Sequence, residues 1–200
     1  MPLEKKEDAG KKERPKTTVS EGYLVVDVKK CAGCIACMLA CSMVHEGIAS
    51  PSHSRIQVVQ DSFRPFPEDI LLGICRQCVN PLCLKACPTG ALHADTANGN
   101  VRVIDESLCD GCRDCIHACP YVPSRVIWNE DKSVAMKCDL CLDTPYWDQT
   151  GGPEGRQACV EICPMRAIKL VRDVPQQKGD AGYHVNLRNE HWGWLGFPTD

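Results

Sequence analysis

The sequence lacks any long apolar run and has few aromatic residues, 6% in all. No stretch approaches the roughly 20 apolar residues that span a bilayer. Residues 1–20 contain no apolar segment of the signal-peptide kind and no twin-arginine pair. A Gly-x-Gly-x-x-Gly motif and a phosphate-binding loop are also missing. These absences argue against membrane insertion, secretion and nucleotide chemistry, and we expect a soluble cytoplasmic protein.

Material for an ordinary hydrophobic core is scarce as well. The apolar share of 44% includes sixteen cysteines, which are 8% of the 200 residues, so that 36% remains without them. Cysteine at this density indicates either a disulfide scaffold or a set of metal sites. Because disulfides do not persist in a reducing cytoplasm, we predict thiolates that bind metal.

The cysteines fall into four quartets with related spacing. The third quartet has the x2, x2, x3 spacing of bacterial ferredoxins, followed by proline, and the first has the same spacing without the proline. The second and fourth quartets are stretched but keep the x3 step to a Cys-Pro. The four quartets are Cys31-x2-Cys34-x2-Cys37-x3-Cys41, Cys75-x2-Cys78-x4-Cys83-x3-Cys87, Cys109-x2-Cys112-x2-Cys115-x3-Cys119 and Cys138-x2-Cys141-x17-Cys159-x3-Cys163.

Every cysteine belongs to a quartet, which predicts four 4Fe-4S clusters with iron held by all sixteen thiolates. Paired Cys-x2-Cys units also occur in zinc ribbons, so a zinc-ribbon binding module is a remote alternative. In ferredoxins the fourth cysteine of a run binds the neighbouring cluster, and the quartets must therefore work in pairs. The spacing alone does not say which quartets pair.

The charge balance bears on possible partners. The formal net charge is −3, and sixteen thiolates around four clusters of charge 2+ would lower it to about −11. A protein of this charge is not expected to bind nucleic acid.

Short strands separate the quartets. We predict them at residues 23–28, 55–59, 91–94, 101–104, 125–128, 133–136 and 167–171. Asn98-Gly99 is a hairpin signal, and the polar residues 129–132 form a second turn. Helical turns are expected between ligands, at 37–45 and 116–118. The predicted fold class is α+β with irregular N- and C-terminal tails.

Three segments lie outside these elements. Residues 1–20 are polar and are expected to be a disordered tail. The loop at 142–158 is expected to run over the surface, either covering a cluster or docking a partner. Residues 183–200 carry Tyr183, Trp192, Trp194 and Phe197, and are expected either to dock on a partner or to cover the chain's own clusters.

No catalytic residues are predicted, since every cysteine is a ligand and the histidines are scattered. His117 lies inside a quartet and is expected to be exposed. Positive charges next to cysteines would favour the reduced state of a cluster, unless they pair with surface carboxylates. These candidates are Lys30, Arg76, Arg113 and Lys137.

From Gly22 onward the chain resembles the four-cluster, ferredoxin-like electron-transfer subunits of molybdenum and tungsten oxidoreductases. The similarity lies in Cys87-Pro88-Thr89-Gly90-Ala91-Leu92, Ala118-Cys119-Pro120-Tyr121 and Lys137-Cys138-Asp139-Leu140-Cys141. It implies two ferredoxin-like dicluster modules, the second inserted in the first: residues 21–68 and 130–182 form the outer module and 69–129 the inserted one. It also implies four ligand sets: Cys31, Cys34, Cys37 and Cys163; Cys138, Cys141, Cys159 and Cys41; Cys75, Cys78, Cys83 and Cys119; and Cys109, Cys112, Cys115 and Cys87.

Two further segments, residues 40–47 and 193–198, look like the small iron-sulfur subunits that accompany tungsten enzymes of the aldehyde ferredoxin oxidoreductase family, such as aldehyde oxidoreductases and tungsten benzoyl-CoA reductases. This resemblance implies a large tungsten or molybdenum pterin catalytic subunit as partner, and a further redox partner such as a ferredoxin or flavin subunit. A free polyferredoxin shuttle is the alternative. Ser42 departs from the other quartets, which have proline there, and is expected at a surface that faces a partner.

Overall fold

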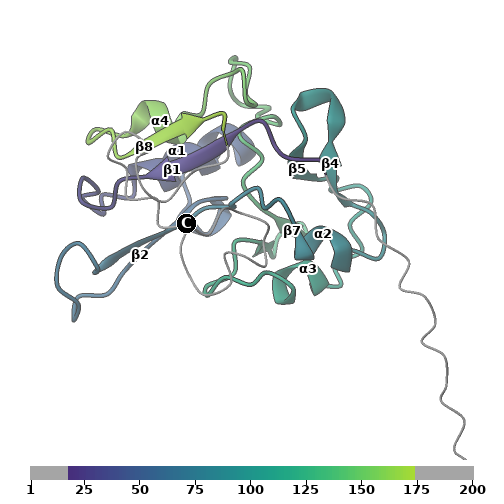
Figure 1. The fold of residues 1–200 in the computed structure, drawn as a ribbon, viewed down its shortest axis with the longest axis horizontal. Coiled ribbons are helices and arrows are strands. Elements are labelled where there is room, and N and C mark those ends of the chain that lie inside the picture. The colour runs from purple at the N-terminus through teal and green to yellow at the C-terminus, as the bar shows by residue number, and fades with distance from the viewer. Residues whose placement is uncertain (1–17, 174–200) are drawn as a thin grey trace, which may run out of the picture.

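The computed structural model describes residues 18–173, which form short helices and four two-stranded antiparallel sheets (Figure 1). The predicted tail at 183–200 and almost all of the tail at 1–20 lie outside the described residues. In chain order the elements are β1 (Tyr23–Val26), α1 (Ala36–Glu46), η1 (Pro51–His53), β2 (Gln57–Gln60), β3 (Ile70–Gly73), α2 (Leu82–Ala86), β4 (Leu92–Asp95), η2 (Thr96–Asn98), β5 (Val101–Ile104), α3 (Asp114–His117), β6 (Ile127–Asn129), β7 (Val134–Met136), α4 (Ala158–Ile162) and β8 (Ile168–Val171).

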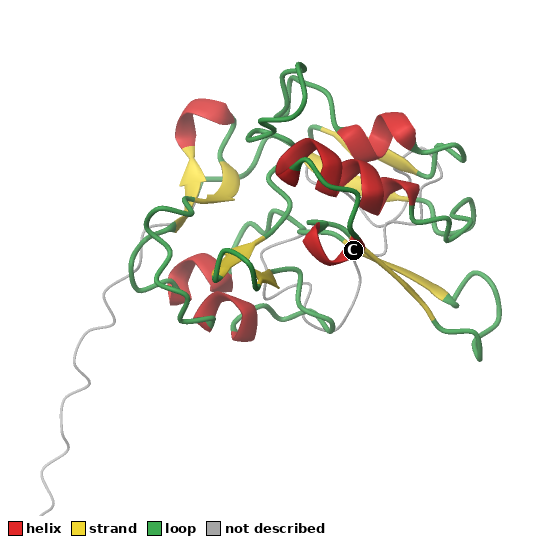
Figure 2. Ribbon diagram, turned by 180° about the vertical axis from the view of Figure 1, so that it is seen from behind, coloured by secondary structure: helices red, strands yellow, loops and turns green. Residues whose placement is uncertain are grey.

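The first and last strands of the described chain pair with each other. β1 and β8 are antiparallel, with Tyr23 opposite Val171 and Val26 opposite Ile168. Helices α1 and α4 pack together in the same half of the molecule, as Figure 2 shows. Segments more than 110 residues apart in sequence are therefore held side by side.

The middle of the chain builds the other half. Two hairpins, β4–β5 and β6–β7, lie near the packed helices α2 and α3. The third hairpin, β2–β3, projects from the body, and Phe63 in its connecting loop is 99% exposed. Within residues 18–173, no helix has the length and apolar character needed to cross a membrane.

The apolar core is small and cysteine takes part in it. Its largest cluster joins Leu24 of β1, Met38 of α1, Leu72 of β3 and Ile168 of β8. Five cysteines belong to this cluster, and cysteines also contribute to or pack against the three smaller ones. Aliphatic packing alone thus fills only part of the interior.

Proline decides where the helices at the cysteines stop. α2 and α4 end just before Cys87 and Cys163, and each of these cysteines is followed by a proline, which cannot continue a helix. Cys41 is followed by Ser42, and α1 continues to Glu46. The expectation that Ser42 faces a partner is wrong: the residue is fully buried, and its hydroxyl donates to the Leu39 carbonyl.

The predicted strands are all present, with ends shifted by at most two residues, and both predicted helical turns are found. β3, α2 and α4 were not predicted individually. The fold is a mixture of short helices and small sheets, as the predicted class requires.

Candidate iron-sulfur sites

Four small cavities are each lined by four cysteines, three from one quartet and one from another. These sets of four coincide with the ligand sets that the resemblance implies, and their role as ligands stays a prediction. The sets are Cys31, Cys34, Cys37 and Cys163; Cys41, Cys138, Cys141 and Cys159; Cys75, Cys78, Cys83 and Cys119; and Cys87, Cys109, Cys112 and Cys115.

The loops between the first cysteines of a quartet have the backbone shape of an anion-binding site. Gly33 and Ile35 in the first quartet have φ values of 65° and 56°, and Gly111 and Arg113 in the third have 76° and 65°. Left-handed residues placed among right-handed ones turn successive N–H groups toward a common centre. Such a concavity suits thiolate and sulfide.

Backbone N–H groups also reach the fourth cysteines directly. The Leu92 amide donates to Cys87 Sγ at 3.4 Å, and the Arg125 amide donates to Cys119 Sγ at 3.2 Å. The Ala167 amide donates to Cys163 Sγ at 3.3 Å. Hydrogen bonds of this kind stabilise the charged form of sulfur.

The buried thiols need a positive charge to become ligands. Burial raises the pKa of Cys37, Cys83 and Cys141 to about 12. Only a thiolate binds metal, so a cationic group in the cavity must offset this burial. Within residues 18–173, no three His, Cys, Asp or Glu side chains are placed to hold a single metal ion.

One cavity contains buried cations that call for an anionic group. The cavity of Cys75, Cys78, Cys83 and Cys119, called here the arginine-lined cavity, is also lined by Arg76, Arg102 and Arg125. Arg125 is 6% exposed, and its Nε and Nη1 have no hydrogen-bond partner among the described residues. A 4Fe-4S core of charge 2+ on four thiolates carries a net charge of about −2. Such a group would fit these orphaned donors.

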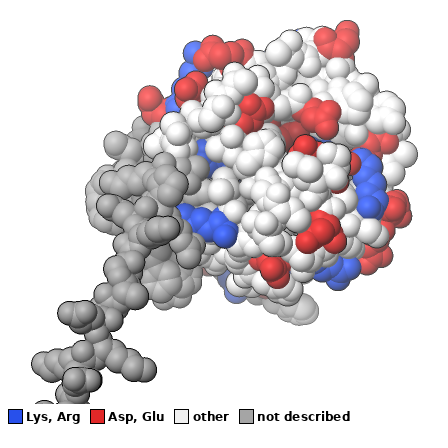
Figure 3. Space-filling model, turned by 90° about the vertical axis from the view of Figure 1, so that its right-hand side faces the viewer, with Lys and Arg blue, Asp and Glu red and all other residues white. Residues whose placement is uncertain are grey.

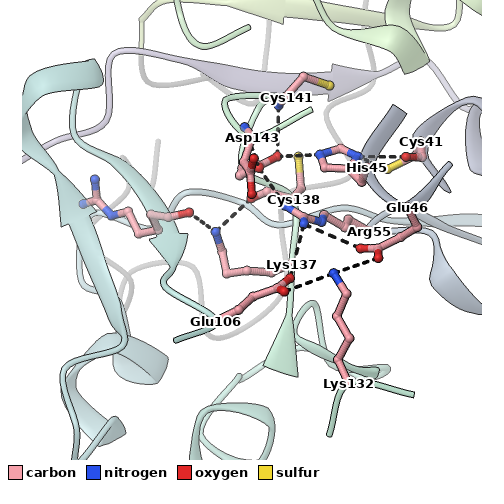
Figure 4. A network of polar contacts seen from close by, with 12 residues as sticks. Cys41, His45, Glu46, Arg55, Glu106, Lys132, Lys137, Cys138, Cys141 and Asp143 are labelled. Carbon is pink, nitrogen blue, oxygen red and sulfur yellow. Dashed lines mark hydrogen bonds and ion pairs between the residues drawn. The ribbon is translucent and has the colours of Figure 1, made fainter. Parts of the chain in front are cut away.

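A buried ion network lies beside the cavity of Cys41, Cys138, Cys141 and Cys159 (Figure 4). Asp139 accepts from Arg55 Nη1 at 2.7 Å and from His45 Nε2 at 3.0 Å. Burial alone would raise the pKa of Asp139, but the neighbouring Arg55 and His45 hold that pKa well below its usual range. His45 Nδ1 lies 2.7 Å from the Cys41 carbonyl oxygen, so that the imidazole links α1 to the fourth quartet.

The network continues to the surface through alternating charges. Arg55 lies 3.9 Å from Glu46 and 3.8 Å from Glu106, and Lys132 bridges both carboxylates at 2.9 and 3.0 Å. Lys137 is buried at the other end of the network and donates to the Cys138 carbonyl at 2.8 Å. Sequence reasoning missed Asp139, Arg55 and the two glutamates, because nothing in their spacing indicates that they meet.

The predicted tuning residues have different surroundings. Lys30 is half exposed and pairs at 3.4 Å with Asp27, whose carboxylate is buried rather than at the surface. Arg113 stacks 4.0 Å from the Trp128 ring, whereas Arg76 and Lys137 are buried. His117 is exposed as expected. Sequence reasoning did not find Arg102 and Arg125, which lie on the hairpin segments that follow the second and third quartets.

The loop at 142–157 contains no helix or strand and packs on α1. Trp147 contacts the small apolar cluster of Val44, Cys141 and Ala158, and the Tyr146 amide donates to the Val44 carbonyl. Part of the loop also lines a separate cavity of about 380 Å³ that contains no cysteine. The loop therefore covers the side of the molecule next to Cys141.

Residues 68–173 match the family profile described as "4Fe-4S dicluster domain". The chain belongs to this family.

Relatives of this 4Fe-4S dicluster protein include subunits of oxidoreductases. A subunit of the anaerobic dimethyl sulfoxide reductase of Shigella flexneri is 33% identical over 187 residues, covering 88% of this chain and 85% of the relative. The polyferredoxin-like subunit of an aliphatic sulfonate oxidoreductase from Pyrococcus furiosus is 37% identical, covering 70% of each chain. Among solved structures, the BamBC active-site complex of benzoyl coenzyme A reductase aligns with 75% of this chain and 78% of its own at 21% identity, with a TM-score of 0.39.

Proposed function

We propose that this iron-sulfur protein passes single electrons along four 4Fe-4S clusters, between a redox partner and the catalytic subunit of an oxidoreductase. The observation that carries the proposal is the set of four cavities, each lined by four cysteines. We further propose that the catalytic subunit is a tungsten or molybdenum pterin enzyme of the aldehyde ferredoxin oxidoreductase family. The chain itself has no catalytic role in this account.

The sixteen cysteines divide into the four ligand sets named above. When bound, each cluster supplies a centre that takes up and releases one electron. The chain supplies thiolates, backbone N–H groups directed at sulfur, and apolar walls that exclude water. It thereby fixes the distances between centres and tunes their potentials.

The cysteine pairing divides the chain into an outer module, residues 21–68 and 130–182, and an inserted module, residues 69–129. The pairing of β1 with β8 and the packing of α1 on α4 support the outer module. The packing of α2 on α3 supports the inserted one. Each fourth cysteine then joins the two clusters of its own module, as the ferredoxin rule requires.

The partner assignment rests on relatives and on short segments. The names of both relatives describe parts of larger oxidoreductases. The tungsten assignment depends on residues 40–47 and 193–198, of which the second segment lies outside the described structure. A cytoplasmic location agrees with such a partner.

Purification of the native complex tests this function. We expect a large metal-pterin subunit to copurify with the chain, and tungsten or molybdenum to appear in proportion to iron. Recovery of the chain alone, loaded with clusters, would instead favour the free polyferredoxin shuttle.

Deletion of residues 183–200 tests the predicted docking tail. Undiminished complex formation would contradict a docking role for this tail, whereas loss of the partner with full iron content would support it.

A further inference from the structure

The four cysteine-lined cavities differ sharply in the charge that surrounds them. Among the described residues, no charged side chain lines the cavity of Cys31, Cys34, Cys37 and Cys163. One Asp and one Arg line the cavity of Cys87 and the third quartet, Asp110 and Arg113. In the cavity of Cys41 and the fourth quartet, Asp139 offsets the cations Arg55 and His45.

The arginine-lined cavity is different because its charges all have one sign. Arg76, Arg102 and Arg125 line it, and within residues 18–173 it has no carboxylate in its wall. Their exposed fractions are 3%, 1% and 6%, so water screens them little. On the surface the signs are mixed: Figure 3 shows basic and acidic side chains interspersed across one face.

The partners of Arg102 and Arg125 are neutral. Arg102 donates to the carbonyls of Thr18 and Cys78 at 2.7 and 3.0 Å and also to that of Asn100, and its Nε has no partner in the part of the chain that the structure describes. Arg125 faces the Tyr121 ring at 5.4 Å. Carbonyls and a ring orient a guanidinium but do not neutralise its charge.

The neighbouring backbone makes room for this charge. A Cβ on Gly73, at the end of β3, would lie 2.7 Å from Arg125 Nη1. Arg76 lines the same cavity as Arg125 and is 3% exposed, so the two buried charges repel each other. Arginine keeps its charge in proteins, and negative charge in the cavity lowers this repulsion.

We propose that the arginine-lined cavity holds the cluster with the highest reduction potential of the four, and that the charge of Arg125 helps to set that potential. Reduction adds one electron, and so one negative charge, to the group inside the cavity. Three buried cations favour that added charge, whereas the other cavities offer little or no net positive charge. The first electron to enter the loaded protein therefore resides next to Tyr121 and Arg125. This inference rests on the proposed function, because it requires a cluster in each cavity.

An EPR-monitored redox titration of the cluster-loaded full chain tests the role of Arg125. In R125Q the reduction potential of the highest-potential cluster should fall by about 59 mV, which is about a tenfold decrease in the equilibrium constant for its one-electron reduction. The reduction potentials of the other three clusters should not change. R125K retains the charge and should stay close to the wild type. R64Q is the matched control, because Arg64 is 66% exposed and pairs with the surface residue Asp61. An unchanged first component in R125Q, or an equal shift in R64Q, would overturn the proposal.

A second measurement keeps all the arginines in place, and so does not depend on whether R125Q folds. A nitroxide is attached through a ketone-bearing amino acid at Val122, which is 92% exposed and lies three residues after Cys119. A second sample carries the label at Leu108, 53% exposed and next to Cys109. Reduction of the loaded protein by one electron makes one cluster paramagnetic. This reduction should increase the electron-spin relaxation rate of the nitroxide at position 122 more than that of the nitroxide at position 108. The reverse order would refute the proposal, whereas iron content below four clusters would count against the proposed function instead.

Discussion

Asp139 lies between two predicted ligands, Cys138 and Cys141, and serves two cations at once. Its carboxylate accepts hydrogen bonds from the side chains of Arg55 and His45. It also accepts a hydrogen bond from the backbone amide of Cys141 at 3.0 Å. A buried carboxylate in such a position holds α1, the segment before β2 and the fourth quartet in one arrangement. Its removal leaves His45 buried without its anion, and leaves Arg55 with only the more distant Glu46 and Glu106, at 3.9 and 3.8 Å.

D139N should therefore destabilise the loaded protein by roughly 3–5 kcal/mol, the usual cost of leaving a buried charge without its partner. The expected result is a lower guanidinium midpoint for the loss of visible cluster absorbance. D131N is the matched control, since Asp131 is 76% exposed and pairs with His53 at 2.8 Å. Equal midpoints for D139N and wild type would mean that the network does not support this site.

Residue-level charge was only partly predictable from the sequence. Arg76 and Lys137 stand beside cysteines, so proximity in sequence was enough to select them. Arg102 and Arg125 lie 15 and 6 residues after the last cysteine of their quartets, and only the return of the hairpin segments brings them to the arginine-lined cavity. Sequence spacing holds no information on such contacts.

At the scale of elements, the long loop at 142–157 depends on one close backbone approach. A Cβ on Gly151 would lie 1.8 Å from the Cys141 carbonyl oxygen, a distance that no rotamer change can relieve. The absence of a side chain lets the loop pass directly over the segment that contains Cys141.

G151A should displace the loop and disturb the cavity of Cys141, so we expect the loss of about one cluster, or about four irons, per chain. Iron and sulfide analysis after anaerobic purification measures this loss. G90A is the control: Gly90 also has a cysteine nearby, but a Cβ there meets no atom within 4 Å, and only its φ of +75° costs about 1 kcal/mol. Full iron content in G151A would show that the loop plays no part in holding this site.

Strands with an alternating or β-branched sequence pattern and a turn signal were predicted from the sequence. Strand β3 and the short helices α2 and α4, which lack such a pattern, were not predicted. Alternating or β-branched runs with a turn signal between them identified β4–β5 and β6–β7. β3 is a plain apolar run whose pairing with β2 spans a loop of nine residues. α2 and α4 have five residues each, too few for a helical period to show. Their positions depend on the cysteines around them rather than on their own sequence.

At the scale of the whole molecule, the cysteines are part of the apolar core. Each apolar cluster includes cysteines or packs against them, and the four cavities lie within or between these clusters. Without metal, buried thiols and empty space would replace what a core supplies elsewhere.

Removal of iron should abolish cooperative unfolding. After anaerobic chelation we expect far-UV circular dichroism to lose its sigmoidal thermal transition, and addition of iron and sulfide to restore it. A cooperative transition retained by the iron-free chain would show that the aliphatic core is sufficient by itself.

The central claim is that each cysteine-lined cavity holds a 4Fe-4S cluster, and the most direct test is a count of iron and acid-labile sulfide in the anaerobically purified chain. The account predicts about sixteen irons and sixteen sulfides per chain, from four ligands per cluster and sixteen cysteines. About eight irons, or zinc in place of iron, would contradict it.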